Sequence, residues 1–404
     1  MKWMSVRLGD IADFSNGINF DKTAYGHGIK MIAVSDFGNR FFPDIDQLQE
    51  VKMDVVRQGN LLQEGDIVFV RSNGNKELVG RCMLIPHLYQ LLTFSGFVIR
   101  CRFFEPQWFY PRFFAYYFKT KAFRRAMGGT AIGANIQNLS QTRLSSHVAT
   151  IPDITTQKTI ANILSAYDDL IENNRKQIKL LEEAAQRLYK EWFIDLRFPG
   201  YETTPIHDGI PDGWEKEVLD ELIEFNPKYT VPKERQKRVF PMSSLSTSSM
   251  VLDFSESSYS NSVSGARFSN GDTLLARITP CLENGKTAYV GGLQDGEIAI
   301  GSTEFIVMRS KRLNPYMVYL LARSSDFRKT AINSMTGSDG RQRAQVDMLK
   351  LFPYLRPSKS VIDSFEHLAK PMFEQIYNLN KQISQLIEGR DRLLPKLMNG
   401  EMEV

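Results

Sequence analysis

The sequence predicts an α+β protein that contains two similar globular units and two long helices paired as an antiparallel coiled coil. Three observations predict this class: an internal repeat, a long heptad pattern in each half, and globular segments in which apolar strands alternate with turns. The chain has 404 residues, 42% of them hydrophobic and 24% charged, which is enough for two or three domains with separate cores.

Several classes of protein are disfavoured by composition. No apolar run reaches the roughly 18 residues that a membrane helix needs, and the charged N-terminal segment is unlike a secretory signal. Cys82, Cys101 and Cys281 are scattered, which disfavours a disulfide scaffold and fits a reducing cytoplasm. The five histidines form no metal-ligand spacing, so we expect no metal site.

The second half repeats the first at an offset of about 205 residues. LQEGDIVFVRSNG (62–74) aligns with FSNGDTLLARITP (268–280), and both contain Gly-Asp, an apolar run and then Arg. The alignment is free of gaps near the end of each half, where Asn173 matches Asn378 and Leu188 matches Leu393. Two long copies are not a solenoid, and they predict a pseudo-twofold molecule with similar but non-identical surfaces.

Linkers and heptads give the domain boundaries. The Pro- and Gly-rich segment 198–213 separates the halves, and shorter breaks at 151–153 and 356–360 end the globular parts. We therefore predict a first globular domain, a first long helix, a second globular domain and a second long helix at residues 1–152, 153–198, 199–357 and 358–404.

The long helices are predicted from apolar residues at alternating spacings of four and three, which is typical of a coiled-coil seam. The seams are Ile160, Leu164, Tyr167, Ile171, Asn174, Ile178, Leu181, Ala185, Leu188 and Trp192, and Phe365, Ala369, Met372, Ile376, Leu379, Ile383, Leu386, Arg390, Leu393 and Leu397. Asn174 has two interpretations: it fixes the register of the pair, or it is tolerated near solvent. Pro371 should kink the second helix or delay its start.

Basic residues concentrate in the globular parts. Residues 98–147 contain eight Arg or Lys and one acidic residue, and residues 305–356 contain ten and three. In the segment 112–125 they alternate with aromatic residues, for which we predict a core position because large aromatics mostly pack inside. The recurrence of the basic face in both copies favours nucleic-acid binding over an ordinary solvated helix face.

Two Gly-containing loops per copy supply the side chains that pair with base edges in DNA, although any domain has polar surface loops. The loops differ between the halves more than the flanking strands do, so they would recognise two different short sequences. The candidate DNA-binding residues are Arg71, Asn73, Asn75, Lys76, Asn135, Gln137, Asn138, Arg143, Arg277, Thr279, Asn284, Lys286, Ser338, Arg341, Gln342 and Arg343.

Catalytic motifs are not completed. Gly285-Lys286-Thr287 resembles the end of a phosphate-binding loop, but Pro280 occupies the position of its first glycine, so we predict a turn. Asn226-Pro227-Lys228-Tyr229 resembles the Asn-Pro-Pro-Tyr motif of amino-methylating enzymes, with Lys in place of the second Pro and no Gly-rich cofactor loop. We find no nucleophile–base constellation, so a binding subunit is favoured and no catalytic residue is assigned.

The whole chain resembles the specificity subunit of Type I restriction–modification systems. The resemblance rests on four segments in the family's order and spacing: IPDITTQKTI (151–160), WFIDLRFPGYE (192–202), IPDGWE (210–215) and RDRLLPKLMNGE (390–401). The second domain ends as YLRPSKSVID (354–363), where the family has Pro-Pro-Leu and a Gln.

The resemblance implies two target-recognition domains, each reading half of a bipartite asymmetric site in double-stranded DNA. It also implies that the helices set the gap and bind two methyltransferase subunits, and that two restriction–translocase subunits join the complex. S-adenosylmethionine, ATP and Mg²⁺ would belong to those partners and not to this chain. The alternatives are a coiled-coil adaptor for proteins alone and a stand-alone DNA methyltransferase.

Overall fold

The computed structural model describes residues 3–38, 40–73, 78–128, 137–231, 236–261, 263–338 and 340–404. Two compact units divide the chain: residues 1–171 with 385–404, and residues 172–384. The dividing lines fall inside both long helices, α5 (Ile154–Phe193) and α10 (Lys359–Met398), so each unit contains part of both. The predicted α+β class is confirmed.

Unit 1 contains a four-stranded antiparallel sheet in the order β2-β9-β5-β7, a three-stranded sheet in the order β4-β3-β8, and two strand pairs, β1-β11 and β6-β10. Its strands are β1 (Trp3–Arg7), β2 (Ala12–Asn16), β3 (Tyr25–Ile32), β4 (Glu50–Val51), β5 (Ile67–Val70), β6 (Ser72–Asn73), β7 (Cys82–Leu84), β8 (Leu92–Phe94), β9 (Val98–Phe103), β10 (Gln137–Asn138) and β11 (Val148–Pro152). Its short helices are α1 (Leu8–Ile11), α2 (Pro111–Lys119), α3 (Lys121–Met127) and α4 (Gln141–Ser146).

Unit 2 repeats this plan. Its sheets have the orders β15-β22-β19-β20 and β17-β16-β21-β18, and its strand pairs are β14-β23 and β12-β13. Its strands are β12 (Ile206–His207), β13 (Ile210–Pro211), β14 (Glu215–Val218), β15 (Ile223–Phe225), β16 (Lys237–Phe240), β17 (Ser258–Ser260), β18 (Ala266–Phe268), β19 (Thr273–Ala276), β20 (Thr287–Tyr289), β21 (Ala299–Gly301), β22 (Phe305–Ser310) and β23 (Pro353–Arg356). Its short helices are α6 (Leu219–Leu222), α7 (Pro315–Arg323), α8 (Ser325–Asn333) and α9 (Val346–Lys350). The repeat seen in the sequence is therefore a repeat of topology.

The repeated Gly-Asp motif begins the central strand of each main sheet. Gly65 and Gly271 have φ angles of 86° and 87°, which glycine adopts without strain. The aspartates that follow, Asp66 and Asp272, are each 1% exposed and accept the N–H three residues before them. Each also binds an arginine of the neighbouring strand: Asp66 binds Arg102 at 2.6 and 2.7 Å, and Asp272 binds Arg309 at 3.2 Å. A buried aspartate thus fixes the same turn to the same strand twice.

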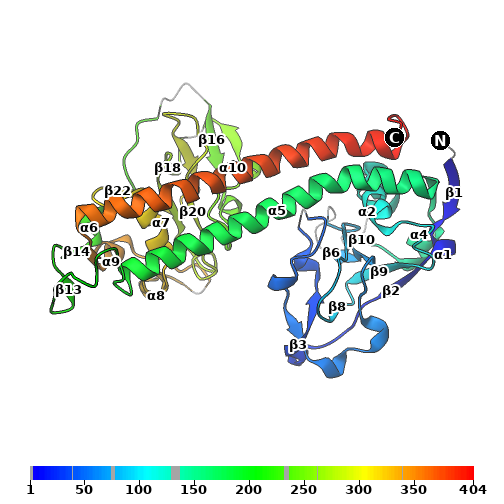
Figure 1. Ribbon diagram of the computed structural model, residues 1–404, viewed down its shortest axis with the longest axis horizontal. Coiled ribbons are helices and arrows are strands. Elements are labelled where there is room, and N and C mark those ends of the chain that lie inside the picture. Colours follow the sequence, from blue (N-terminus) through cyan, green and yellow to red (C-terminus); the bar gives the residue numbers. More distant parts are fainter. Residues whose placement is uncertain are drawn as a thin grey trace. The chain divides into compact units, whose positions relative to one another are not determined.

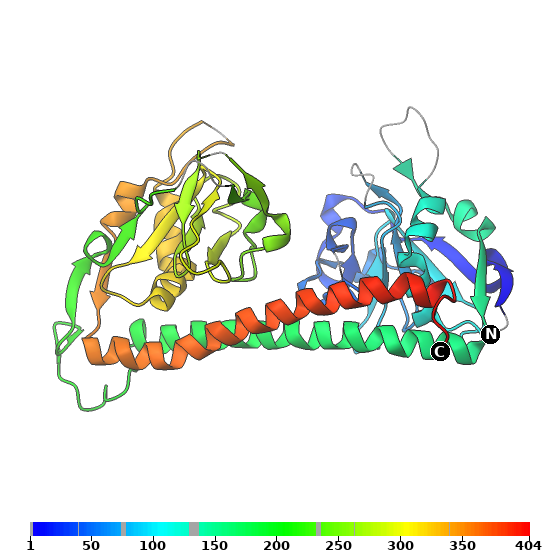
Figure 2. The same ribbon diagram turned by 90° about the horizontal axis from the view of Figure 1, so that it is seen from above.

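Within each unit the two long helices run side by side and antiparallel (Figure 1 and Figure 2). In unit 1, Ile160, Ala161 and Leu164 of α5 share a core with Leu394 and Leu397 of α10. In unit 2, Tyr189, Trp192 and Phe193 of α5 pack around the Phe365 ring of α10. The heptad prediction is confirmed in both units.

Two seam positions answer questions that the sequence left open. Asn174 is 5% exposed and donates from Nδ2 to Oε1 of Gln382 at 3.2 Å, so it is an interhelical contact and not a solvent position. The predicted delay at Pro371 is wrong, because α10 begins at Lys359 and continues through this residue. Pro371 is exposed while Ala369 and Phe373 are buried, and their packing offsets the lost backbone hydrogen bond.

Candidate nucleic-acid interface

The structure joins the two candidate loops of unit 1. Strand β6 follows Arg71, and it pairs with β10 so that Asn73 is opposite Gln137 and Asn138 is opposite Ser72. The Leu139 N–H donates to the Arg71 carbonyl at 2.8 Å. Segments about 65 residues apart in the chain therefore form one structure at the end of β5. In Figure 2 they lie on the side of unit 1 that faces away from α5 and α10.

The candidate side chains of unit 1 differ in what holds them. Arg71 donates from Nη1 to the Gly96 carbonyl at 3.1 Å, and Arg143 donates from Nε and Nη2 to the Ala126 carbonyl near the end of α3. Asn138 is exposed. Asn75, Lys76 and Asn135, together with the side chains of Asn73 and Gln137, lie outside the part of the chain that the structure describes.

The same junction occurs in unit 2. The Ala344 N–H donates to the Arg277 carbonyl at 2.8 Å, which repeats the contact between Leu139 and Arg71. The Thr279 N–H donates to the Gln342 carbonyl at 3.1 Å, and Ile278 forms an isolated bridge with Arg343. Both pairs of loops that the sequence singled out are thus brought together at equivalent places on equivalent scaffolds.

Several unit 2 candidates are held by the protein. Arg277 donates to the Ala344 carbonyl, and Lys286 donates to the Met242 carbonyl at 3.0 Å. Arg343 forms a two-pronged pair with Glu304 at 2.6 to 3.0 Å, and this pairing lowers the pKa of Glu304. The Thr279 hydroxyl is buried without a hydrogen-bond partner in the described structure. These four side chains are therefore poorly placed to approach a DNA base without rearrangement.

Asn284, Ser338 and Arg341 are exposed, and Gln342 is partly exposed. Arg341 follows a turn in which its N–H donates to the Ser338 carbonyl at 3.0 Å. An exposed arginine on such a turn can offer its guanidinium to guanine or phosphate. Burial thus divides the candidates into residues that shape the loop and residues that can reach a ligand. Glu304, which holds Arg343, was missed by the sequence interpretation because no motif marks it.

The basic and aromatic segment of unit 1 is mainly core. Phe113, Phe114, Tyr116 and Phe118 of α2 and Phe123 of α3 are at most 1% exposed, as the sequence predicted for its aromatics. Arg112 pairs with Asp169 on α5, and Lys119 donates to the Arg40 carbonyl. Lys121 and Arg125 are exposed. Part of the predicted nucleic-acid face is therefore occupied by contacts within the protein, and the remainder stays a prediction.

The incomplete catalytic motifs have structural roles. Residues 281–285 form a turn in which Gly285 has a φ angle of 79°, and β20 begins at Thr287, so the turn predicted for Gly285-Lys286-Thr287 is confirmed only at Gly285. Asn226 accepts the Val307 N–H at its side-chain oxygen, and the Tyr229 hydroxyl donates to Asp272. Across the described residues there is no cluster of His, Cys, Asp or Glu suited to a metal ion. None of the helices among these residues is both long and apolar enough to cross a membrane.

Comparison with known proteins finds similarity to specificity subunits of Type I restriction enzymes. The family model for the Type I restriction modification DNA specificity domain matches residues 1–183. Residues 1–183 are thus similar to the specificity domain of Type I restriction–modification systems. Among its relatives, the MjaIX specificity subunit of Methanocaldococcus jannaschii is 27% identical over 307 residues, which are 72% of this chain and 68% of that protein. The EcoAI specificity subunit of Escherichia coli is 35% identical over 168 residues, 39% of this chain but only 28% of that protein.

Solved structures support the fold over the full length. The S subunit of a Type I restriction–modification system from M. genitalium has a TM-score of 0.55 with 14% identity, and the match covers 98% of this chain and 96% of that one. At this identity the similarity shows the fold alone. The shared fold agrees with the repeat of topology described above.

Proposed function

We propose that this chain is the DNA-specificity subunit of a Type I restriction–modification complex, and that each unit reads one half of a bipartite asymmetric site. The observation that supports this most strongly is the repeated loop junction. Arg71 with Leu139, and Arg277 with Ala344, make the same backbone contact at the end of the same strand. The loops around these contacts carry different side chains, as two different half-sites require.

We further propose that the chain is not itself an enzyme and holds no cofactor for the methylation or cleavage reactions. S-adenosylmethionine would be used by two methyltransferase subunits, and ATP and Mg²⁺ by two restriction–translocase subunits. The incomplete motifs at Asn226 and Gly285 support this division of labour, because both are occupied by structural hydrogen bonds or turns. A cytoplasmic location follows from this proposal, since the DNA target lies there.

The long helices would set the gap between the half-sites and carry the methyltransferase subunits. Adding one heptad to each helix near Gln177 and Gln382 lengthens each by about 10 Å while keeping the seam in phase. At about 3.4 Å per base pair, the spacer of the methylated motif should grow by roughly three base pairs or less. An unchanged spacer with full activity would show that the helices do not set the gap.

Direct binding to DNA separates the proposal from its alternatives. The purified chain should bind mixed-sequence duplex DNA with an affinity that falls as salt rises, because phosphate contacts release counterions. Arg341→Ala should weaken binding and reduce the salt slope by about one ion, whereas Arg187→Ala, an exposed arginine of α5, should change neither. Absence of salt-dependent binding would favour a protein adaptor. Methyl transfer by the chain alone would favour a complete methyltransferase.

A further inference from the structure

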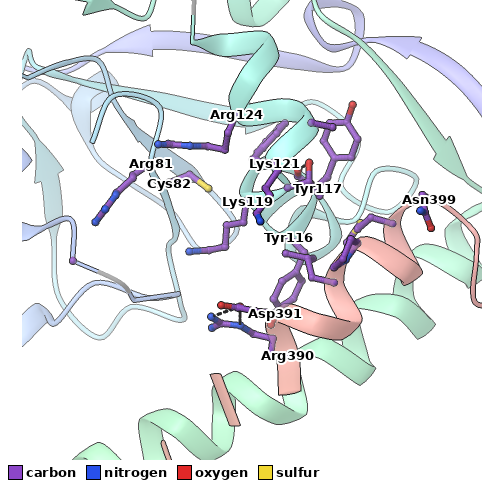
Figure 3. A pocket seen from close by; sticks show the side chains of 17 residues that line it. Arg81, Cys82, Tyr116, Tyr117, Lys119, Lys121, Arg124, Arg390, Asp391 and Asn399 are labelled. Atoms are coloured by element: carbon purple, nitrogen blue, oxygen red, sulfur yellow. Dashed lines mark hydrogen bonds and ion pairs between the residues drawn. The ribbon is translucent and has the colours of Figure 1, made fainter. Parts of the chain in front are cut away.

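Unit 1 contains a cavity of about 610 Å³ between its globular part and the end of α10. Its walls come from the start of β7, from α2 and α3, and from the last turns of α10 (Figure 3). The basic side chains that line it are Arg81, Lys119, Lys121, Arg124 and Arg390, and Asp391 is an acidic one. The cavity therefore has an excess of positive charge.

The carboxylate of Asp391 is already paired with an arginine. Asp391 accepts from Arg390 at 2.8 and 3.0 Å, as the dashed lines of Figure 3 show, and Arg390 also binds Asp168. Lys119 makes a 3.1 Å hydrogen bond to the Arg40 carbonyl. No carboxylate of the described residues forms an ion pair with Arg81, Lys119 or Lys121. Arg81, Lys119 and Lys121 thus line the cavity without a carboxylate partner among the described residues.

In unit 2, backbone carbonyls accept hydrogen bonds from the cations at the corresponding positions. Lys286, which corresponds to Arg81, donates to the Met242 carbonyl, and Arg323, which corresponds to Lys119, donates to the Thr247 and Gly285 carbonyls. Arg328, which corresponds to Arg124, donates to the Glu283 carbonyl. In unit 2 the side chains of Lys286, Arg323 and Arg328 hold the backbone of neighbouring loops. In unit 1 Arg81 and Lys119 line a cavity.

We propose that the cavity of unit 1 binds a small phosphate ester, with its phosphates against Arg81, Lys119 and Lys121. Cavities of roughly 300–1,000 Å³ suit small ligands and cofactors. Leu394, Pro395 and Met398 form an apolar wall of α10 for the remainder of the molecule. Burial lowers the pKa of Lys119, and a bound phosphate would favour its charged form. A DNA duplex is too wide to enter, and the cavity wall formed by α10 lies away from the loop junction (Figure 2).

Titration calorimetry on the full chain tests the proposal with two probes, pyrophosphate and ATP, each at constant ionic strength. Both should bind the native chain and raise its melting temperature, and ATP should bind more tightly because it also contacts the apolar wall. The double variant Arg81→Ala/Lys121→Ala removes two cations that are at least partly exposed, so the fold should persist. Its affinity for both probes should fall at least tenfold.

The matched control is Lys176→Ala/Arg187→Ala, which removes two exposed cations of α5 in unit 2. This control should bind both probes as the native chain does. A second variant, Asn399→Trp, places a ring at the cavity rim without changing charge, and it should weaken ATP more than pyrophosphate.

The proposal is overturned if neither probe binds at millimolar concentration, or if the control variant weakens binding as much as the cavity variant. It is also overturned if duplex DNA competes with ATP, because the site would then be part of the DNA surface. Equal affinity for the two probes would contradict the role given to the apolar wall.

Discussion

The two units share one sheet topology but attach it to the long helices differently, through a buried polar group in unit 1 and through apolar side chains in unit 2. In unit 1 the Tyr116 hydroxyl donates to Asp168 at 2.6 Å, and Asp168 accepts from Arg390 at 2.5 Å. The ion-paired side chains are 3% and 8% exposed. The repeat places Phe373 at the position of Asp168, Ala185 at that of Arg390, and Leu320 at that of Tyr116.

In unit 2 those positions are apolar and buried, and Phe373 packs against the rings of Tyr289, Tyr316 and Tyr319. Burial by itself lowers the pKa of Arg390, yet the carboxylates of Asp168 and Asp391 outweigh it, so the net change is upward. Buried ion pairs stabilise little relative to apolar packing, but they penalise any arrangement that separates them. The comparison shows that the same scaffold accepts a polar or an apolar contact here. We expect the polar contact to make unit 1 selective for its helix partner, because a partner without the cation would leave Asp168 buried and unpaired.

The largest effect should come from breaking the pair on one side. Arg390→Ala leaves Asp168 buried without its cation and should destabilise unit 1 by about 3–5 kcal/mol. The control is Arg392→Ala, whose partner Glu388 lies on the exposed face and whose loss should cost less than about 1 kcal/mol. Urea unfolding with hydrogen exchange on α2 and α10 measures both. Equal destabilisation by the two variants would contradict the account.

Replacing the polar group of unit 1 with the corresponding apolar residues of unit 2 should restore the stability lost in Arg390→Ala. The triple variant Tyr116→Leu/Asp168→Phe/Arg390→Ala removes the whole polar group and fills its space with the larger ring, as unit 2 does. We expect stability within a few kcal/mol of the native chain, or above it, because apolar replacement of buried ion pairs is often neutral or stabilising. A triple variant as unstable as Arg390→Ala alone would show that the pair is needed for folding and not for selectivity.

A half-length fragment gives a second test of the selectivity of helix pairing. Residues 1–200 contain one globular part and α5, and two copies can pair helix to helix to give a dimer that should direct methylation of a palindrome of the first half-site. In that dimer Asp168 would face Ala185 of the other copy, so Ala185→Arg should tighten dimerisation about tenfold or more. Gln186→Arg adds the same charge on the exposed face and should not. Sedimentation equilibrium measures both, and equal dimer affinities would remove the selectivity argument.

A smaller effect concerns the matched aspartates. Burial raises the pKa of Asp272 to about 7. The folded chain therefore keeps a proton that the unfolded chain has lost above its ordinary carboxyl pKa of about 4, so stability should fall as pH rises from about 4 to 7. Asp272→Asn should flatten this part of the stability curve. Native-like pH dependence in Asp272→Asn would assign the effect to another group.

The sequence predicted the repeat, the α+β class and both heptad seams, and it singled out the candidate loops without predicting that they pair. Periodic apolar residues and Gly-Asp turns are local signals, and the structure keeps them. Other features depend on contacts distant in the chain. Arg343 is held by Glu304, 39 residues away, and Asp168 meets Arg390, 222 residues away, so no local pattern separates these residues from exposed ones. The predicted delay of the second helix at Pro371 was wrong for the same reason, since buried Ala369 and Phe373 keep the helix continuous.

The most direct test of the central claim is the methylated motif in cells that express the chain with its methyltransferase subunits. The double variant Arg341→Ala/Gln342→Ala changes side chains of the unit 2 loop junction and leaves unit 1 intact. Single-molecule sequencing should report relaxed or altered bases in one half-site, with the other half-site and the spacer unchanged. An unchanged motif, or changes in both half-sites, would contradict the assignment of one half-site to each unit.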